Sequence, residues 1–199
     1  MKHTITFKGV NDELNVPRLG GKSLLPSDIH WPVNPNGKKL TLILSLPTSY
    51  LNSVCQFNYP ADKVISVFTT YDSEDYFLDV IGYHGNEDEL EKIKSGFTKV
   101  ILHTVGNPRN ESDYLIPANE ITANDELDDN SASFIANKPE LLQNEILALD
   151  TYNFCMQLYG DDFPEGFDDI FYLSDSYGYL YLSGEETSTD TGIFFTQCT

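Results

Sequence analysis

Residues 40–46 read LTLILSL, the longest nearly uninterrupted apolar run of the chain. A membrane-spanning helix needs about 20 apolar residues, so this run is too short to cross a bilayer. It ends at Pro47, and short apolar runs bounded by turn residues are typical of buried strands. The run therefore predicts a core strand of a globular protein. The composition, with 40% apolar, 13% aromatic and 22% charged residues, agrees.

The sequence before this strand is rich in turn-forming residues. Seven Pro and Gly residues fall between positions 17 and 37, which excludes a helix or regular sheet and predicts an ordered loop passing Trp31. We assign this loop to support of the fold, because Pro and Gly fix its path and Trp31 supplies buried area. Alternation over residues 4–7 predicts a short half-buried strand further upstream.

The sequence after the strand predicts further strands and one short helix. β-branched and aromatic residues in 64–70 and 76–81 flank a polar stretch, which predicts a hairpin. Residues 86–94 have a capping residue, acids in the first turn and lysines in the last, which predicts a helix. Residues 99–105 predict the next strand.

The second half predicts an exposed acidic loop over 121–137 and then the longest helix, over 139–159. The prediction of that helix is based on one apolar stripe: Leu142, Ile146, Leu149, Tyr152, Met156 and Tyr159. Three short strands are expected at 170–173, 178–183 and 192–196. The fold class is α+β, mostly antiparallel strands with two helices, in a single domain over residues 1–199.

The net charge of −19 is distributed unevenly along the chain. Residues 1–110 hold 11 basic and 12 acidic residues, whereas residues 111–199 hold one basic residue, Lys138, and 19 acidic ones. An acidic C-terminal half therefore begins at about residue 111. Such a field repels phosphate backbones and anionic lipid, which argues against direct nucleic-acid and membrane binding. It attracts a basic protein surface.

Chemically reactive residues show no arrangement typical of catalysis. The three cysteines, at 55, 155 and 198, form no C-x-x-C pair, which argues against a disulfide framework or a zinc site. The four histidines lack metal-ligand spacing and indicate polar packing. No Gly-rich phosphate loop or nucleophile elbow is present. We expect no catalytic activity, no cofactor and no metal. Since no signal-peptide h-region opens the chain, we also expect a cytoplasmic location.

Aromatic residues interleave with acids in the acidic half, a composition that protein interfaces favour. The candidate partner-binding residues are Asp125, Glu126, Asp128, Asp129, Asp161, Asp162, Phe163, Glu165, Asp168, Asp169, Asp175 and Tyr177. Phe163 and Tyr177 are the candidate anchors. Two plainer interpretations stand beside this one: the aromatics belong to the core, and the acids form a solvated face that keeps the protein soluble.

Two blocks of the sequence resemble the YwqG-like family of bacterial domains of unknown function. The first is RLGGKSLLPSDIHWPVNPNGKKLTLIL, residues 18–44, in which Gly20, Gly21, Leu25, Pro26, Trp31, Pro32 and Gly37 match the family's pattern and Ser23 replaces a usual proline. The second is DSYGYLYLSGEETSTDTGIFFTQ, residues 175–197. Together they cover about a quarter of the chain.

The resemblance implies an α+β fold without established catalytic residues. It also implies a family in which some members are immunity proteins encoded beside secreted bacterial toxins, including nuclease effectors of type VI secretion systems. We therefore predict an immunity protein that binds and occludes a cognate basic toxin, a nuclease effector of this kind. The alternative is a housekeeping binding domain, or an unrecognised enzyme with a site near His30 and the loop of residues 20–31.

Overall fold

The apolar run at 40–46 forms strand β3 (Thr41–Pro47), buried along almost its whole length in the wall of a closed barrel. The computed structural model describes residues 2–10, 13–55, 57–125, 131–142, 147–167, 169–184 and 191–198. β3 pairs antiparallel with β4 (Lys63–Thr69), which pairs with β5 (Thr98–Thr104) over seven residue pairs. The expected strands at 40–46, 64–70 and 99–105 are thus confirmed.

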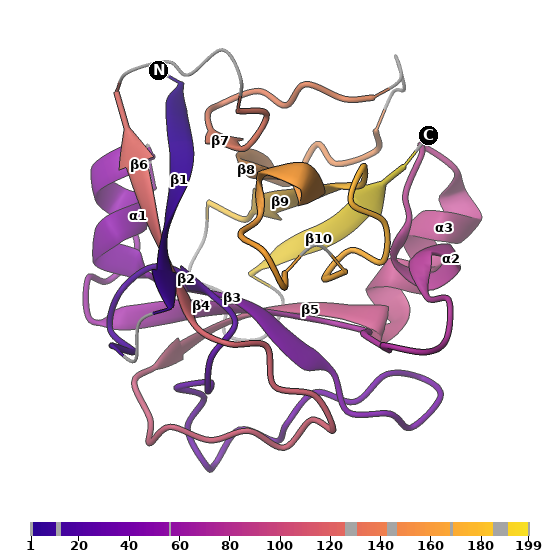
Figure 1. Cartoon of the computed structure of the whole chain (residues 1–199), viewed down its shortest axis with the longest axis horizontal. Helices are drawn as coiled ribbons and strands as arrows, with labels where there is room; N and C mark the ends of the chain where they lie inside the picture. The colour runs from indigo at the N-terminus through magenta and orange to yellow at the C-terminus, as the bar shows by residue number, and fades with distance from the viewer. Residues whose placement is uncertain are drawn as a thin grey trace.

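The barrel wall has ten strands among the described residues, in the order β1-β6-β2-β3-β4-β5-β10-β9-β8-β7, and β7 pairs back to β1 (Figure 1). The other strands are β1 (His3–Val10), β2 (Arg18–Leu19), β6 (Asn119–Asn124), β7 (Phe134–Ile135), β8 (Asn153–Tyr159), β9 (Tyr177–Leu182) and β10 (Gly192–Gln197). The helices are α1 (Thr48–Val54), α2 (Leu78–Ile81) and α3 (Glu87–Lys92), with a π-turn η1 (Ile93–Phe97) and a 3-10 turn η2 (Gly160–Asp162). The expectation of mostly antiparallel strands is confirmed.

The wall consists of two halves that are each continuous in sequence. Strands β1 to β6 form one half and strands β7 to β10 the other. The halves meet at two short seams: β1 and β7 share two residue pairs, and β5 and β10 share the pair Val100 and Gly192. Threonine side chains reinforce the second seam, since Thr98 donates to the carbonyl of Phe194 at 2.7 Å and Leu102 N donates to Thr191 Oγ1 at 3.2 Å.

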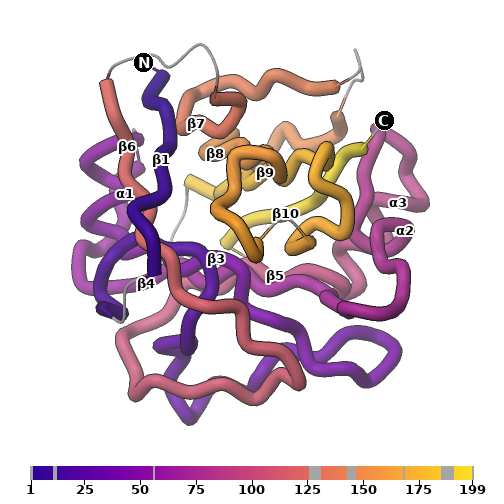
Figure 2. The backbone as a smooth tube through the Cα atoms, viewed as in Figure 1, coloured from indigo at the N-terminus to yellow at the C-terminus, as the bar shows by residue number. Residues whose placement is uncertain are grey.

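Buried apolar side chains lie both inside the barrel and against its outer surface. In β9, Leu180 and Leu182 face the interior cluster, whereas Tyr179 and Tyr181 pack outside with residues of α3 and β10. This confirms the two faces that alternation predicts for this strand. Segment 160–176 lies across the barrel opening in Figures 1 and 2, and several of its apolar side chains join the interior cluster.

Most of the Pro- and Gly-rich stretch packs on the outer surface of β3 and β4, but Arg18 and Leu19 form β2 of the wall, so the expectation that excluded regular sheet from this stretch is wrong there. Trp31 is buried, donates from Nε1 to the carbonyl of Leu40 at 2.8 Å, and meets Phe68 edge to face. Arg109 ties the loop down by donating to the carbonyls of Leu25, Pro26 and Ile29. The expected role of this loop in supporting the fold agrees with these contacts.

The helix predicted over 139–159 is wrong. Residues 153–159 form β8, and the described residues of 139–152 contain turns rather than a helix. The apolar stripe misled because β8 is apolar on both faces: Phe154 packs outside the barrel, whereas Met156 and Leu158 pack inside it. A run that is apolar on both faces cannot be assigned to helix or strand by periodicity.

Three other expectations need correction. The predicted hairpin of 64–70 with 76–81 does not form, because β4 already has β3 and β5 as neighbours and Asp72 accepts the N–H groups of Glu74 and Asp75 in a turn. The loop expected over 121–137 contains most of β6 and all of β7, whose apolar residues are buried. Residues 170–173 form turns instead of a strand.

The helix predicted at 86–94 is confirmed as α3. The Asn86 side chain accepts from Asp88 N at 2.8 Å, and Gly96, with φ of 115°, lies inside the following turn η1. No helix among the described residues is long and apolar enough to cross a membrane.

Candidate partner-binding face

Segment 160–176 leaves the barrel wall after β8 and returns to it at β9. Gly160 N donates to the carbonyl of Ser176 at 3.0 Å, so the two ends of the segment are tied together as in a compact Ω-loop. The segment is anchored by four buried apolar side chains in the barrel interior: Phe163, Phe167, Ile170 and Phe171. Gly178 allows the close approach of Phe171, because a Cβ at position 178 would lie 2.5 Å from that ring.

The chain makes a strained turn at Tyr172, immediately after Phe171. Tyr172 has φ of 67°, and Leu173 N donates to the carbonyl of Phe171 at 2.8 Å, which is the hydrogen bond of a γ-turn. A γ-turn with positive φ at its central residue is rare and strained. The turn directs Phe171 into the core and leaves Tyr172 and Leu173 exposed by 36% and 37%.

A second segment, residues 71–77, brings aromatic rings against this turn. Tyr76 is 52% exposed and meets Tyr172 edge to face with ring centroids 5.0 Å apart, and Phe77 supports Tyr172 from below at 5.6 Å. Tyr71 donates from its hydroxyl to Asp169 at 3.0 Å. Burial first, and this hydrogen bond second, raise the pKa of Tyr71. Tyr76, Tyr172 and Leu173 thus form an exposed apolar patch beside an ordered carboxylate.

A second aromatic pair lies across the base of the segment. Tyr159 and Tyr177 stack with centroids 4.4 Å apart, and the Tyr159 hydroxyl donates to Asp161 at 3.0 Å. That bond, burial and the charge of Asp161 raise the pKa of Tyr159 to about 12. Burial first, and then neighbouring carboxylates that include Asp175, raise the pKa of Tyr177.

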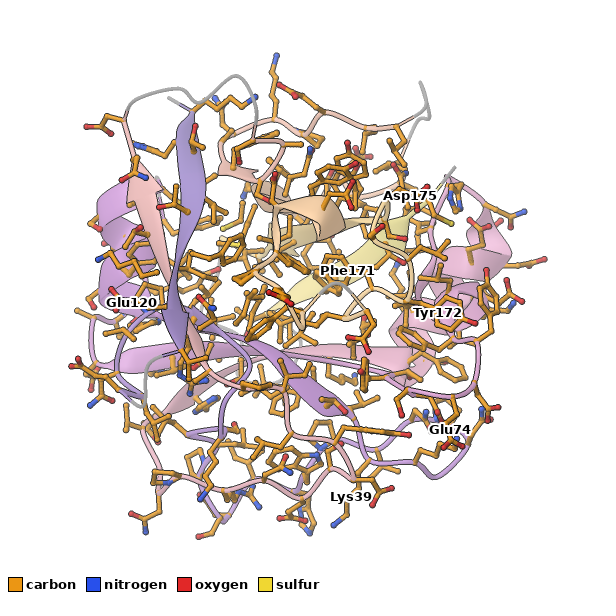
Figure 3. The ribbon with its side chains drawn as sticks, in the orientation of Figure 1. Lys39, Glu74, Glu120, Phe171, Tyr172 and Asp175 are labelled. Atoms are coloured by element: carbon orange, nitrogen blue, oxygen red, sulfur yellow. The ribbon has the colours of Figure 1, made fainter. Side chains whose placement is uncertain are left out.

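Asp175 influences the pKa values of several groups around the base of segment 160–176. Its charge acts on Tyr159 and Tyr177 and, together with Asp79, on the Cys198 thiol, whose pKa is raised first by burial and then by these two carboxylates. Figure 3 shows Asp175, Tyr172 and Glu74 along one side of the molecule. We call the following set the acidic-aromatic face: Tyr76, Asp79, Tyr159, Asp161, Asp169, Tyr172, Leu173, Asp175 and Tyr177.

The charge of this face is not neutralised by neighbours in the sequence, since residues 139–184 contain no Lys or Arg. Acids elsewhere have basic partners, as in the ion pairs Lys38–Asp72 at 2.9 Å and Lys8–Glu120 at 3.1 Å. The acids of segment 160–176 therefore have no basic residue within their own stretch of sequence.

The structure brings together part of the predicted contact set. Asp161, Asp169, Asp175 and Tyr177 lie on the acidic-aromatic face, and Glu165 is exposed on the same segment. Glu126, Asp128, Asp129 and Asp168 lie outside the described residues.

Three predicted residues take other positions. Phe163 is buried against Phe7 and Phe171, so it is not available as a surface anchor. Asp162 accepts from Ser133 N at 2.6 Å and so holds the chain before β7. Asp125 lies just after β6 and pairs with His3 at 2.8 Å.

The sequence analysis missed Tyr76, Tyr172 and Leu173. Tyr76 was assigned to a strand, and 170–173 to another. The positive φ of Tyr172 could not be predicted, because tyrosine rarely adopts such a backbone conformation. The abundance of aromatic residues in this part of the chain could be read from the sequence.

His103 and the start of the loop near residues 20–31 make structural contacts. His103 is held between Ser66 at 2.8 Å and the carbonyl of Thr104 at 2.7 Å, and burial lowers its pKa. Gly21 N donates to the carbonyl of Ile116, and Arg18 is buried beneath Gly21. No group of three or more His, Cys, Asp or Glu among the described residues is placed to hold a metal ion.

A family model matches most of the chain. A search of curated proteins finds no match. The model of the family described as a domain of unknown function, DUF1963, matches residues 17–186, a span that runs from just before β2 to just beyond β9 and includes segment 160–176. This match extends over most of the chain, so the protein belongs to the DUF1963 family of domains of unknown function.

Proposed function

We propose that the protein is an immunity protein that binds a basic toxin through the acidic-aromatic face and blocks the toxin's substrate site. The observation that carries this proposal is the exposed patch of Tyr76, Tyr172 and Leu173, which lies at a strained turn beside the Asp169 carboxylate. Exposed aromatic anchors surrounded by charge are the common composition of interface centres.

The patch has the features of a preorganised anchor. Tyr172 is held by edge-to-face contacts with Tyr76 and Phe77, so its ring loses little freedom on binding. Backbone strain persists only where the surrounding structure enforces it, and such strain concentrates at functional sites. Here the enforcing contacts are Phe171 in the barrel interior and the bond of Tyr71 to Asp169.

The charge indicates the chemistry of the partner. A nuclease binds a phosphate backbone in a basic groove, and a carboxylate-rich face with aromatic anchors complements such a groove. Negative charge also speeds capture of a basic protein. The finer assignment to a YwqG-like immunity protein, acting in the cytoplasm on a type VI nuclease effector, is part of this proposal and rests on the resemblance of residues 18–44 and 175–197.

Co-expression with the product of the adjacent gene tests the proposal. The expected result is that the neighbour alone is toxic, and that this protein binds it in a pull-down and abolishes its toxicity. If the neighbour is harmless, or kills without being bound, the proposal is wrong. The search then moves to a ligand near residues 20–31.

Paired variants locate the contact surface. Tyr76→Ala with Tyr172→Ala removes the anchors, and Asp169→Asn with Asp175→Asn removes two charges with little change of shape. We expect each pair to weaken toxin binding at least tenfold. Asp28→Asn with Asp62→Asn is the matched control, because both carboxylates are exposed on other parts of the surface. Equal affinity of all three pairs would place the interface elsewhere.

A further inference from the structure

Two cysteines 100 positions apart in the sequence lie in contact. Cys55 follows the last residue of α1, and Cys155 lies in β8. Their sulfur atoms are 3.8 Å apart and both thiols are free. The pair therefore joins the end of α1 to a residue of β8 that belongs to the interior cluster.

A bulge in β8 aims Cys155 at this position. Phe154 pairs with Tyr181 and Met156 pairs with Leu180, so Cys155 is the extra residue between two consecutive pairs. Neighbours in a regular strand point to opposite faces, yet Cys155 and Met156 both belong to the interior cluster. A bulge redirects a side chain in this way and is less constrained than a regular ladder. A small backbone shift there can bring the sulfur atoms to the roughly 2.0 Å of a disulfide bond.

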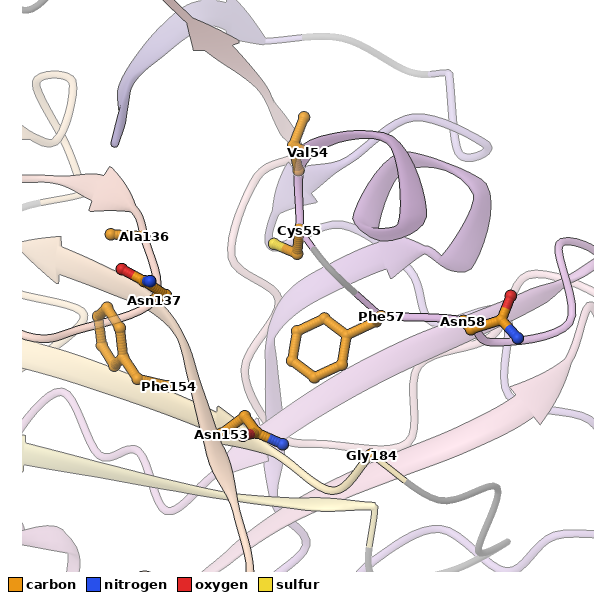
Figure 4. A pocket seen from close by; sticks show the side chains of 9 residues that line it. All are labelled: Val54, Cys55, Phe57, Asn58, Ala136, Asn137, Asn153, Phe154 and Gly184. Atoms are coloured by element: carbon orange, nitrogen blue, oxygen red, sulfur yellow. The ribbon is translucent and has the colours of Figure 1, made fainter. Parts of the chain in front are cut away.

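One of the two thiols is reachable from solvent. Cys55 is partly exposed and lines a pocket of about 340 Å³, whereas Cys155 is fully buried. Figure 4 shows the Cys55 sulfur and the Phe57 ring on one side of this pocket and Asn137 and Phe154 on the other. A small neutral oxidant can enter the pocket and meet Cys55 first.

We propose that Cys55 and Cys155 form a reversible disulfide, made when hydrogen peroxide enters this pocket and oxidises Cys55. The Cys55 sulfur attacks one peroxide oxygen, the O–O bond breaks, and one water leaves as Cys55 becomes a sulfenic acid. The Cys155 sulfur then attacks the Cys55 sulfur, the S–O bond breaks, and a second water leaves. Two thiols lose two electrons and two protons in total, and one peroxide is reduced to two waters.

The protonation of Cys155 agrees with this order of events. The hydrogen bond between the two thiols, burial, and the charge that a Cys55 thiolate would carry together raise the pKa of the Cys155 thiol well above its ordinary value. Cys155 is therefore unreactive while Cys55 is a thiol. Oxidation of Cys55 to a sulfenic acid supplies an electrophile in direct contact with Cys155, so the buried thiol reacts only in the second step.

The bridge would act as a clamp between α1 and the barrel wall. It closes a loop that contains half of the chain, and cross-links over such loops stabilise proteins chiefly by restricting the unfolded state. The expected rise in Tm of the oxidised protein is on the order of 10 °C.

Peroxide titration of the full chain with counting of free thiols tests the proposal. The Cys198→Ser variant leaves only the proposed pair, and we expect it to lose both thiols together, to become about 2 Da lighter, and to recover its thiols with a reducing agent. The peptide containing Cys55 should be found linked to the peptide containing Cys155. The Tm should rise on oxidation and fall on reduction.

Single variants separate the roles of the two sulfurs. With Cys155→Ser, Cys55 should stop at the sulfenic acid, which a dimedone probe captures, or proceed to the sulfinic acid. With Cys55→Ser, Cys155 should remain a thiol under the same conditions. Sulfinic acid at Cys55 with Cys155 intact, dimers linked through Cys198 in the wild-type chain without the internal bridge, or three unreacted thiols would each overturn the proposal.

Discussion

Tyr172 combines an unfavourable backbone conformation with a surface position. Its φ of 67° costs an L-residue about 1 kcal/mol or more, and its ring contacts recover part of that cost. A residue selected for stability alone at this position would be glycine, which adopts positive φ freely. The presence of a tyrosine agrees with a role for its side chain at the surface.

Substitution at Tyr172 should reverse the usual order of Ala and Gly. We expect Tyr172→Gly to be more stable than Tyr172→Ala by about 1 kcal/mol, because alanine keeps the strain and glycine relieves it. Urea denaturation of both variants measures the difference. At Leu173, whose φ is not positive, the order should be the ordinary one, with alanine more stable. The same order at both positions would show that the turn at Tyr172 carries no strain.

Asp72 should control part of the acid sensitivity of the protein. Backbone N–H bonds from Glu74 and Asp75 and the ammonium of Lys38 hold the pKa of this carboxyl well below its ordinary value. Because the pKa is depressed in the folded state, its stabilising contribution is complete above an unfolded pKa of about 4 and is lost as pH falls below that value. Asp72→Asn should therefore be less stable than wild type at pH 6, and the two should converge towards pH 2.

Thermal unfolding at a series of pH values follows this convergence. Asp62→Asn is the control, because it removes one exposed carboxylate on another part of the surface. A constant difference between Asp72→Asn and wild type from pH 6 to pH 2 would contradict the assignment.

Segment 160–176 is the element that builds the acidic-aromatic face, and its position depends on Gly160. A Cβ at position 160 would overlap the carbonyl oxygen of Ser174. Gly160→Ala should therefore displace residues 172–176 from the barrel, cost about 1 to 3 kcal/mol of stability, and weaken partner binding more than that loss alone explains.

The control for Gly160→Ala is Gly184→Ala. A Cβ at position 184 has its nearest neighbour, the Asn153 amide nitrogen, at 3.7 Å, an ordinary contact distance. Both variants can be compared by chemical denaturation and by affinity for the partner. If Gly160→Ala keeps the wild-type affinity for the partner, partner binding does not depend on the position of segment 160–176.

Predictability from sequence differed between elements for physical reasons. Residues 40–46 and α3 were predictable because their signals, an apolar run and a capped start, depend on nearby residues only. β8 was not, because its two apolar faces reflect the closure of the barrel, a long-range property. Most of β6 and all of β7 were hidden because their buried residues lie in polar, acidic sequence.

The candidate site was predictable in composition and unpredictable in geometry. The excess of acids and tyrosines in the second half indicated part of the acidic-aromatic face, namely Asp161, Asp169, Asp175 and Tyr177. The pairing of that segment with Tyr76 depends on contacts across about 100 residues of sequence, and no local pattern encodes them.

At the scale of the whole molecule, the net charge of −19 should appear in binding kinetics. Raising the salt concentration from low to high ionic strength should slow association with a basic partner by about tenfold or more, because screening shortens the reach of the field. Dissociation should change little with salt, since the buried aromatic contacts control it. Stopped-flow or surface-based kinetics distinguish the two rates. Association that is independent of salt would indicate that the acids serve solubility alone.

The two short seams of the barrel have a consequence for how the folded protein opens. Each half of the wall is continuous in sequence, so the halves can separate without unthreading any strand. Such regions open as cooperative units at a free energy below that of global unfolding. Amide hydrogen exchange should therefore be fastest, among strand and seam amides, at Ile5 and Thr191, which bond across the seams, and slowest at the centre of β4. The protein would then open locally as two subdomains, and the short seam pairings would break before any strand within either half unfolds.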